Sequence, residues 1–230
     1  MEYLIVFLPL VGAFISGFFG KKIGDRNSQI LASVLVAFSG ILSLFIFYKV
    51  IVNDYSENKL IFNWITSGSF NVNWSIYIDS LTAVMLVVVS LISSIIHFYS
   101  IGYMSHDLNK SRFTSYLSLF TFAMLTLVTA DNFLQLFFGW EGVGLCSYLL
   151  IGFWYKKPSA NSAAIKAFLV NRVGDFGFAI GIFLIFLFYG TVNYNEVFQL
   201  TPLFIQKQIL FFGAEFNLIT LICVMLFIGA

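Results

Sequence analysis

The stretch that decides the fold runs from Asn132 to Tyr155 and reads NFLQLFFGWEGVGLCSYLLIGFWY, an apolar run with one charged residue, Glu141. An α-helix needs ~20 apolar residues to cross the ~30 Å hydrocarbon core of a bilayer, whereas a barrel strand needs only ~9–11. The stretch therefore predicts a transmembrane helix with a carboxylate inside it.

The composition of the whole chain agrees with a membrane protein. Of its 230 residues, 60% are hydrophobic and 10% are charged, against roughly 25% charged residues in an average soluble domain. A soluble globule cannot bury that much apolar surface, which excludes a soluble enzyme, a nucleic-acid-binding protein and a disordered chain. The net charge of +1 favours no anionic partner.

Similar apolar runs recur along the chain. A seventh begins near Phe216 and is still apolar at Ala230, so we expect a helix that is incomplete there. The pattern predicts an all-α polytopic membrane protein, an antiparallel transmembrane helix bundle truncated in its seventh helix. The expected complete spans are about 3–20, 30–52, 80–101, 113–130, 132–155 and 162–189.

The basic residues predict an orientation. Most of the 12 Lys and Arg residues lie in the connections that follow the first, third and fifth spans. By the positive-inside rule these connections face the cytoplasm or the matrix, and the N-terminus lies on the outer side, periplasmic or intermembrane.

The connection 53–78 alternates apolar and polar residues around Ser67-Gly68, which predicts a short β-hairpin on the outer membrane face. The link Asp131-Asn132 is so short that the fourth and fifth spans must be antiparallel neighbours. Three polar residues directly precede spans, where we expect their oxygens to cap the helices: Asp79, Asp131 and Asn161.

Charges inside the spans are the candidates for function. Glu141 lies about 14 Å into its span at 1.5 Å per residue, which is near the midplane. Arg172 lies at a similar depth in the next span, entered from the opposite side, and Asp175 follows it. An ionised group at this depth costs at least ~2.5–3.5 kcal/mol, so it should face the bundle interior or a hydrated cavity. Glu141 is either a proton carrier or a structural carboxylate.

The spacing of Arg172 and Asp175, i and i+3, places them on one helix face. They either neutralise each other, or Arg172 reaches other carboxylates and tunes their protonation while Asp175 belongs to a proton path. Gly177 and Gly181 in the same span form a small-residue pair that favours helix packing.

Two further residues are weaker candidates for proton transfer. His97, one turn from serines in the third span, is either a proton relay or a hydrogen-bonded interface group. Lys166, near the start of the sixth span, either reaches the interface or ends a proton path. No phosphate-binding loop, cysteine cluster or paired-histidine helix is present, so the sequence predicts no cofactor or metal site by motif.

Several segments resemble one known family. Its pattern is matched by the Gly139–Tyr155 stretch GWEGVGLCSYLLIGFWY, which is the most specific, and by Tyr77–Met85, Tyr99–Met104, Asp131–Phe133 and Asn171–Phe178. They are similar to the antiporter-like membrane subunit of respiratory complex I, the chain 5 or chain L family of proton-pumping NADH:quinone oxidoreductases.

The resemblance implies antiparallel helix pairs, broken helices and a proton-translocating role. Glu141 matches the glutamate on the input side of a Glu–Lys proton switch, and Arg172 and Asp175 match the charged motif of the sixth helix. The partner lysine of the family follows a Gly-Ala in the seventh helix, so it is expected beyond Gly229-Ala230.

The resemblance also implies three regions: two N-terminal helices in 1–58, the outer hairpin and third helix in 59–110, and the start of a proton-conducting domain in 111–230. It implies that FMN, iron–sulfur clusters and quinone belong to the complex, with no cofactor in this chain. The expected partners are other membrane subunits, the lipid bilayer and protons, in a bacterial or mitochondrial inner membrane, and no nucleic acid.

Two other functions stay open. The chain could belong to a multi-subunit cation/proton antiporter without a redox partner, since such subunits share the Trp-Glu core. It could also anchor a complex without moving protons, in which case Glu141 would only stabilise the assembly.

Overall fold

The computed structural model describes residues 1–68, 70–211 and 213–230, and most of them are helical. The long helices are α1 (Glu2–Ile23), α2 (Asp25–Asn53), α3 (Ser80–Tyr103), α4 (Lys110–Val128), α5 (Phe133–Ile151) and α6 (Pro158–Tyr189). The shorter elements are α7 (Tyr194–Leu200), the 3-10 helix η1 (Thr201–Phe204), α8 (Leu218–Gly229) and the strands β1 (Glu57–Ser67), β2 (Phe70–Ile78), β3 (Gln208–Phe211) and β4 (Ala214–Asn217).

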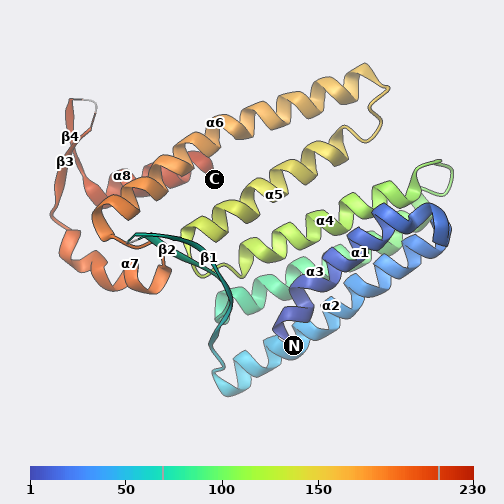
Figure 1. The fold of residues 1–230 in the computed structure, drawn as a ribbon, viewed down its shortest axis with the longest axis horizontal. Coiled ribbons are helices and arrows are strands. Elements are labelled where there is room, and N and C mark those ends of the chain that lie inside the picture. The colour runs from blue at the N-terminus through green and yellow to red at the C-terminus, as the bar shows by residue number, and fades with distance from the viewer. Residues whose placement is uncertain (69, 212) are drawn as a thin grey trace.

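The helices are arranged as the hydropathy pattern predicts. Helices α1 to α4 form one packed group, α5 lies against α4, α6 lies against α5, and α8 lies against α6 (Figure 1). The short link between α4 and α5 makes them antiparallel neighbours, as expected. The all-α bundle with a small hairpin is therefore confirmed.

Within the described residues, five helices are long and apolar enough to cross a membrane: α1, α2, α3, α5 and α6. Helix α4 is not among them, although its sequence predicted a span, because basic and hydroxyl side chains lower its mean hydropathy. Its hydroxyl side chains are buried against neighbouring helices, and they are Ser111, Thr114, Ser118, Thr121 and Thr126. The packed group thus encloses a helix face that carries hydroxyl side chains.

The predicted outer hairpin is formed by β1 and β2, which pair antiparallel from Glu57 opposite Ile78 to Ser67 opposite Phe70. The hairpin is hydrogen-bonded to the first turn of α5. Gln135 accepts a hydrogen bond from the Ser75 amide (3.0 Å) and donates one to its carbonyl oxygen (2.8 Å). The hairpin therefore positions the first turn of α5, the helix that carries Glu141.

Two of the three predicted helix caps are wrong. Asp79 does cap α3, because its carboxylate accepts a hydrogen bond from the Thr82 amide at 2.8 Å. At α5 the cap is Asn132, which accepts from the Gln135 amide at 2.8 Å, and not Asp131. The helix begins one residue later than predicted, so the next side chain along takes the capping position.

Helix α6 begins at Pro158, so Asn161 lies inside its first turn and does not cap it. Proline suits the first helical turn because its missing N–H would have no partner there. The Asn161 side chain instead donates to the carbonyl oxygen of Tyr155 at 2.9 Å. Helix α5 ends at Ile151, before the predicted 155, where the chain turns at Gly152.

The segment between α6 and α8 contains elements that the sequence analysis did not predict, namely α7, η1 and the β3–β4 hairpin. Helix α8 then packs closely on α6. A Cβ atom added at Gly177 would lie 2.7 Å from Ile228, and one at Gly181 would lie 2.8 Å from Leu226. The predicted packing role of this glycine pair is confirmed.

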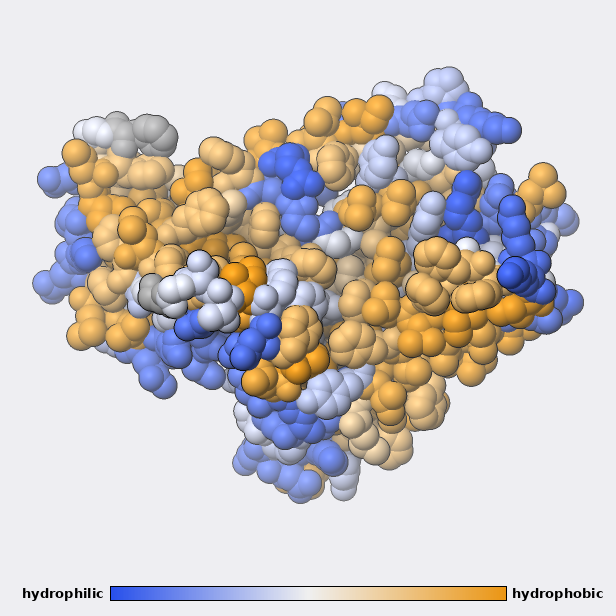
Figure 2. All heavy atoms as spheres, viewed as in Figure 1, coloured by the Kyte–Doolittle hydropathy of each residue, from blue (hydrophilic) through white to orange (hydrophobic). Residues whose placement is uncertain are grey.

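The polar and apolar surfaces are separated along the bundle. Hydrophobic side chains cover much of the visible face over α1 and α2, and hydrophilic ones gather at the end that holds the α1–α2, α3–α4 and α5–α6 connections (Figure 2). The β1–β2 hairpin lies at the opposite end of the helices (Figure 1). A bilayer-spanning orientation fits this separation.

Candidate functional site

The charged residues predicted inside the spans come together between α5 and α6. The guanidinium of Arg172 donates a hydrogen bond to the Glu141 carboxylate, and the same Nη1 atom lies 3.8 Å from the Asp175 carboxylate. Both proposed pairings of Arg172 are therefore present at once. One cation is shared by two carboxylates, and we call Glu141, Arg172 and Asp175 the midspan cluster.

Asp175 is held by a partner that the sequence analysis missed. The indole N–H of Trp140 donates to its carboxylate at 3.0 Å, and the Trp140 ring packs against Phe178, with ring centroids 6.2 Å apart. Trp140 precedes Glu141 on α5. Helix α5 therefore supplies one carboxylate of the cluster, Glu141, and a hydrogen-bond donor to the other, Asp175. A buried indole N–H usually finds a hydrogen-bond acceptor, so the tryptophan next to Glu141 in the sequence could have indicated a second carboxylate nearby.

Burial differs strongly across the midspan cluster. The side chain of Asp175 is 8% exposed, that of Glu141 25%, and that of Arg172 49%. The guanidinium also lies over the ring of Phe168, 5.0 Å from its centroid. A cavity of about 260 Å³ adjoins Asp175 and Trp140, with Asn171 and Ser147 also on its wall. The cluster thus has an anchored carboxylate and a more accessible one.

The glycines around Glu141 set its position. A Cβ atom at Gly139 would lie 2.7 Å from backbone atoms of Leu127, and one at Gly142 would lie 3.0 Å from Ala123, whereas Gly144 has open space around it. Gly139 and Gly142 therefore let α5 approach α4 closely. Glu141, on the other side of α5, contacts α6.

His97 lies away from this cluster, between α3 and α4. It is fully buried; Nδ1 lies 2.8 Å from the Ser93 carbonyl oxygen, and Nε2 lies 2.9 Å from the Ser118 hydroxyl. The Ser93 hydroxyl in turn lies 2.5 Å from that of Thr121. The geometry is that of a hydrogen-bonded interface group within a short polar chain.

Lys166 lies on the exposed surface of α6, six residues before Arg172. Within the described parts of the chain, it makes no ion pair, so the structure does not bring it together with Glu141 or Asp175. Of the five predicted site residues, three form one cluster, and His97 and Lys166 lie outside it.

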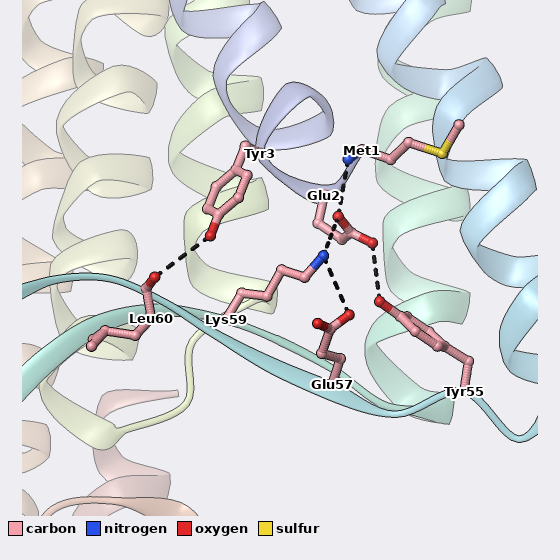
Figure 3. Close-up of polar contacts among 7 residues, drawn as sticks. All are labelled: Met1, Glu2, Tyr3, Tyr55, Glu57, Lys59 and Leu60. Atoms are coloured by element: carbon pink, nitrogen blue, oxygen red, sulfur yellow. Dashed lines mark hydrogen bonds and ion pairs between the residues drawn. The ribbon is translucent and has the colours of Figure 1, made fainter.

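A second ionic cluster, absent from the sequence analysis, ties the start of α1 to the hairpin (Figure 3). Glu2 is 4% exposed. Its carboxylate accepts hydrogen bonds from Lys59 at 2.9 Å, from the N-terminal ammonium at 3.0 Å and from the Tyr55 hydroxyl at 3.1 Å. The hydrogen bond to Glu2 raises the pKa of Lys59 above its ordinary value. We call these residues and Glu57, which pairs with Lys59, the outer clamp.

The hairpin end also holds a polar cavity of about 240 Å³ between β2, the α4–α5 link and the α6–α7 connection. Asp131 on its wall accepts hydrogen bonds from Asn132 at 2.6 Å and from Asn58 at 3.1 Å. Burial, with the nearby charge of Asp131, raises the pKa of the Tyr194 phenol. Asp131 therefore joins the hairpin to the helix link, and does not cap a helix.

Residues 1–68, 70–211 and 213–230 contain no group of three or more His, Cys, Asp or Glu side chains that could hold a metal ion. Cys146 is buried in α5 and Cys223 is exposed on α8, and both are free thiols.

Comparison with known families identifies two segments of the chain. Residues 64–114 match the family described as NADH-ubiquinone oxidoreductase (complex I), chain 5 N-terminus. Residues 130–230 match the family described as NADH:quinone oxidoreductase/Mrp antiporter, transmembrane. The two segments together make up more than half of the chain and include the midspan cluster.

Curated relatives match the whole chain. It is 52% identical to the NADH-ubiquinone oxidoreductase chain 5 of Triticum aestivum over all of its 230 residues, which cover 34% of that protein. It is 50% identical to the chain 5 of Chondrus crispus over the same length, again 34% of the relative. It is 50% identical to the NADH-quinone oxidoreductase subunit L of Rickettsia bellii over 98% of this chain and 35% of that one.

Solved structures share the fold at lower identity. The Mrp complex from Dietzia sp. DQ12-45-1b gives a TM-score of 0.80 at 22% identity, over 99% of this chain and 23% of that one. The membrane-bound sulfane sulfur reductase, an archaeal respiratory complex, gives 0.76 at 17% identity, over 99% of this chain and 43% of that one. The chain spans about a third of the length of its curated relatives, and on these sequence matches it belongs to the family of NADH-ubiquinone oxidoreductase chain 5 and NADH-quinone oxidoreductase subunit L.

Proposed function

We propose that this chain acts in a proton-translocating membrane subunit of an NADH:quinone oxidoreductase, and that Glu141 is the carboxylate that loads and releases the proton. The observation that carries the proposal is the midspan cluster, in which two carboxylates inside the helix bundle share one guanidinium. Family membership supports the choice of complex.

The cluster has the charge balance of a proton-binding site. With both carboxylates ionised and Arg172 between them, it carries one net negative charge, which is costly at this depth and favours uptake of one proton. Because the hydrogen bond from Trp140 stabilises the ionised form of Asp175, the proton is better placed on Glu141, which is also the more accessible of the two for proton exchange. A cation approaching Glu141 from elsewhere in the assembly would release it again.

We assign the neighbouring residues distinct roles. Arg172 tunes the protonation of Glu141, and Asp175 holds the guanidinium in place as a positioning residue that also lies on the proton path. His97 and Lys166 remain weaker candidates for a connection to the inner surface, His97 through its contacts to Ser93 and Ser118 and Lys166 through its exposure on α6.

The assembly around the chain follows from the same proposal. We place FMN, the iron–sulfur clusters and the quinone site in other subunits, and we expect other membrane subunits as partners in a bacterial or mitochondrial inner membrane. The basic connections at one end of the bundle support an N-terminus on the outer side. The regions 1–58, 59–110 and 111–230 are proposed units, and the two family matches support a division of this kind.

The test is Glu141→Gln in the full-length subunit of the intact complex, in inside-out membrane vesicles. NADH oxidation and NADH-driven acidification are recorded together. With normal assembly, we expect both rates to fall, because NADH oxidation that is coupled to proton transfer slows when proton transfer is blocked. Glu215→Gln, an exposed carboxylate on β4, is the matched control and should leave both rates unchanged. Wild-type rates in Glu141→Gln would contradict the proposal.

The second candidate is a subunit of a cation/proton antiporter without a redox partner, which the description of the family matched by 130–230 also covers. Transport by the intact assembly separates the two. Proton movement driven by a Na⁺ or K⁺ gradient without NADH favours the antiporter, whereas proton movement that requires NADH and ignores both gradients favours the oxidoreductase.

A further inference from the structure

A pocket at the basic end of the bundle contains an arginine that pairs with no carboxylate among the described residues. It has a volume of about 190 Å³ and lies between the start of α4, the end of α5 and the start of α6. Arg112 lies on its wall with Tyr116, Tyr148 and Asn161. The pocket shares no wall residue with the midspan cluster.

The guanidinium of Arg112 is held in place but not neutralised. It donates to the Phe153 carbonyl oxygen at 3.0 Å and lies over the rings of Phe153 (4.7 Å) and Tyr155 (5.3 Å). Its buried Nε has no hydrogen-bond partner in the described part of the chain, and no carboxylate there lies within ion-pair distance of it. A partly buried cation with spare donors favours an anionic ligand.

The charge of Arg112 affects the pKa of one carboxylate, Asp107, but the oxygens of Asp107 are hydrogen-bonded to other groups. Asp107 accepts hydrogen bonds from the Asn109 amide at 2.7 Å and from the Trp154 indole at 2.9 Å. Partial burial raises the pKa of Asp107, but these hydrogen bonds and the charge of Arg112 outweigh it and lower that pKa overall. Asp107 therefore stays ionised in its own contacts and leaves the donors of Arg112 free.

The surroundings of the pocket are suited to a phospholipid. Tyr116 and Tyr148 line its wall, and their hydroxyls make no hydrogen bond within residues 1–68, 70–211 and 213–230, so they are free to donate to a phosphate oxygen. Lys156 and Lys157 are exposed beside it on the α5–α6 connection. Ile151 precedes the wall residue Gly152, and Ile165 follows the wall residue Ala164. Both isoleucine side chains are exposed, so acyl chains can pack against them.

We propose that this pocket binds the phosphate of an anionic phospholipid, with Arg112 as its main cationic contact and the tyrosine hydroxyls as further donors. Basic pockets between transmembrane helices on the cytoplasmic or matrix side bind anionic headgroups by this chemistry. A free phosphate ion would use the same donors, but the exposed apolar helix surface beside the pocket favours a lipid. The inference requires only the membrane setting and not the proton-carrying role of Glu141.

The test uses the intact complex in its native membrane vesicles and two photoreactive probes. One is phosphatidylglycerol with a diazirine on its glycerol headgroup, and the other is phosphatidylcholine with a diazirine on its choline. Cross-linked peptides are mapped by mass spectrometry. We expect the anionic probe to label the segments 112–116 and 148–164 several-fold more than the zwitterionic probe does, with no competition from added inorganic phosphate.

Arg112→Gln should lower labelling by the anionic probe roughly fivefold, which corresponds to about 1 kcal/mol for one basic residue at a membrane surface. Lys156→Gln is the matched control, since this lysine is near the pocket but not on its wall, and it should change labelling less. Equal labelling by the two probes would overturn the proposal, and so would full competition by phosphate, which would indicate a free-anion site. Both outcomes are read on the wild-type complex, so they decide the question even if Arg112→Gln does not assemble.

Discussion

The outer clamp and the midspan cluster use the same groups in opposite ways. In the outer clamp, two carboxylates, Glu2 and Glu57, are matched by two cations, Lys59 and the terminal ammonium. The buried Glu2 also accepts a hydrogen bond from Tyr55. In the midspan cluster, two carboxylates compete for the single guanidinium of Arg172. The charges of the first cluster balance, whereas the second lacks one positive charge.

This difference indicates what each cluster does. A carboxylate with three donors, in a cluster whose charges balance, gains nothing from taking up a proton, so the outer clamp serves to hold the hairpin on α1. A carboxylate pair with too few donors lowers its free energy by binding one proton. Position reinforces the contrast, since the clamp is at the hairpin end and the midspan cluster is halfway along α5 and α6.

The largest effect is expected from Arg172→Gln, which leaves Glu141 and Asp175 without their cation. A loss of ~1.4 kcal/mol of charge stabilisation changes proton occupancy about tenfold, so proton pumping in vesicles should fall by about that factor or more. Lys59→Gln removes a cation from the outer clamp and should leave pumping unchanged.

The control for this prediction is Arg172→Lys, which keeps the charge and should retain more pumping than Arg172→Gln. If Arg172→Gln and Lys59→Gln reduce pumping equally at normal assembly, the contrast between the two clusters fails.

Glu2→Gln should affect the stability of the hairpin and leave proton pumping unchanged. Removing one partner of a buried ion pair costs ~3–5 kcal/mol, and we expect about 2 kcal/mol here because Lys59 is 27% exposed and screened by water. Hydrogen exchange of the β1–β2 amides reports the free energy of local opening of the hairpin. Exchange at wild-type rates would show that the clamp contributes no stability.

Trp140→Phe should have a weaker effect than either. It removes the indole donor to Asp175 and keeps an aromatic ring, which costs about 1 kcal/mol for one hydrogen bond. We expect pumping to fall by a few-fold while hairpin exchange stays at wild-type rates. A pumping loss as large as that of Glu141→Gln would mean that Asp175, and not Glu141, carries the proton.

The smallest effect is a change in hairpin stability at high pH. Because the pKa of Lys59 is raised above 10.5 in the folded state, its ion pair with Glu2 stabilises the hairpin fully below that pH and is lost as the pH rises through the folded-state pKa. Thermal unfolding followed by the fluorescence of Trp64 and Trp74 should show a decline there. Lys59→Arg should remove the decline, since arginine stays charged.

The long apolar helices could be predicted from the sequence because their hydropathy is a local property. Helix α4 shows the limit of that signal: its hydroxyls are satisfied by packing against α1 and α3, for instance through the hydrogen bond from Ser115 to the Ala13 carbonyl oxygen at 2.7 Å. The strands β3 and β4 have four residues each, which is too short for alternation to be recognised. The predicted cap of α5, Asp131, is one residue before the actual cap, Asn132.

The candidate site was predictable in its members but not in its contacts. The i, i+3 spacing placed Arg172 and Asp175 on one face of a helix, yet only the packing of α5 on α6 brings that face to Glu141. The contribution of Trp140 depends on a rotamer, and the burial of Glu2 depends on a hairpin more than fifty positions away in the sequence. Such contacts are set by tertiary structure, and local sequence patterns carry no information about them.

The central claim is that Glu141 changes its protonation state during turnover. Infrared difference spectra of the intact complex, recorded between the resting state and NADH-driven turnover, report this change through the C=O stretch of a protonated carboxyl group. We predict a carboxyl band that is present in the wild type and in Glu215→Gln and absent in Glu141→Gln. A difference spectrum that is unchanged in Glu141→Gln would contradict the claim and leave Glu141 as a structural partner of Arg172.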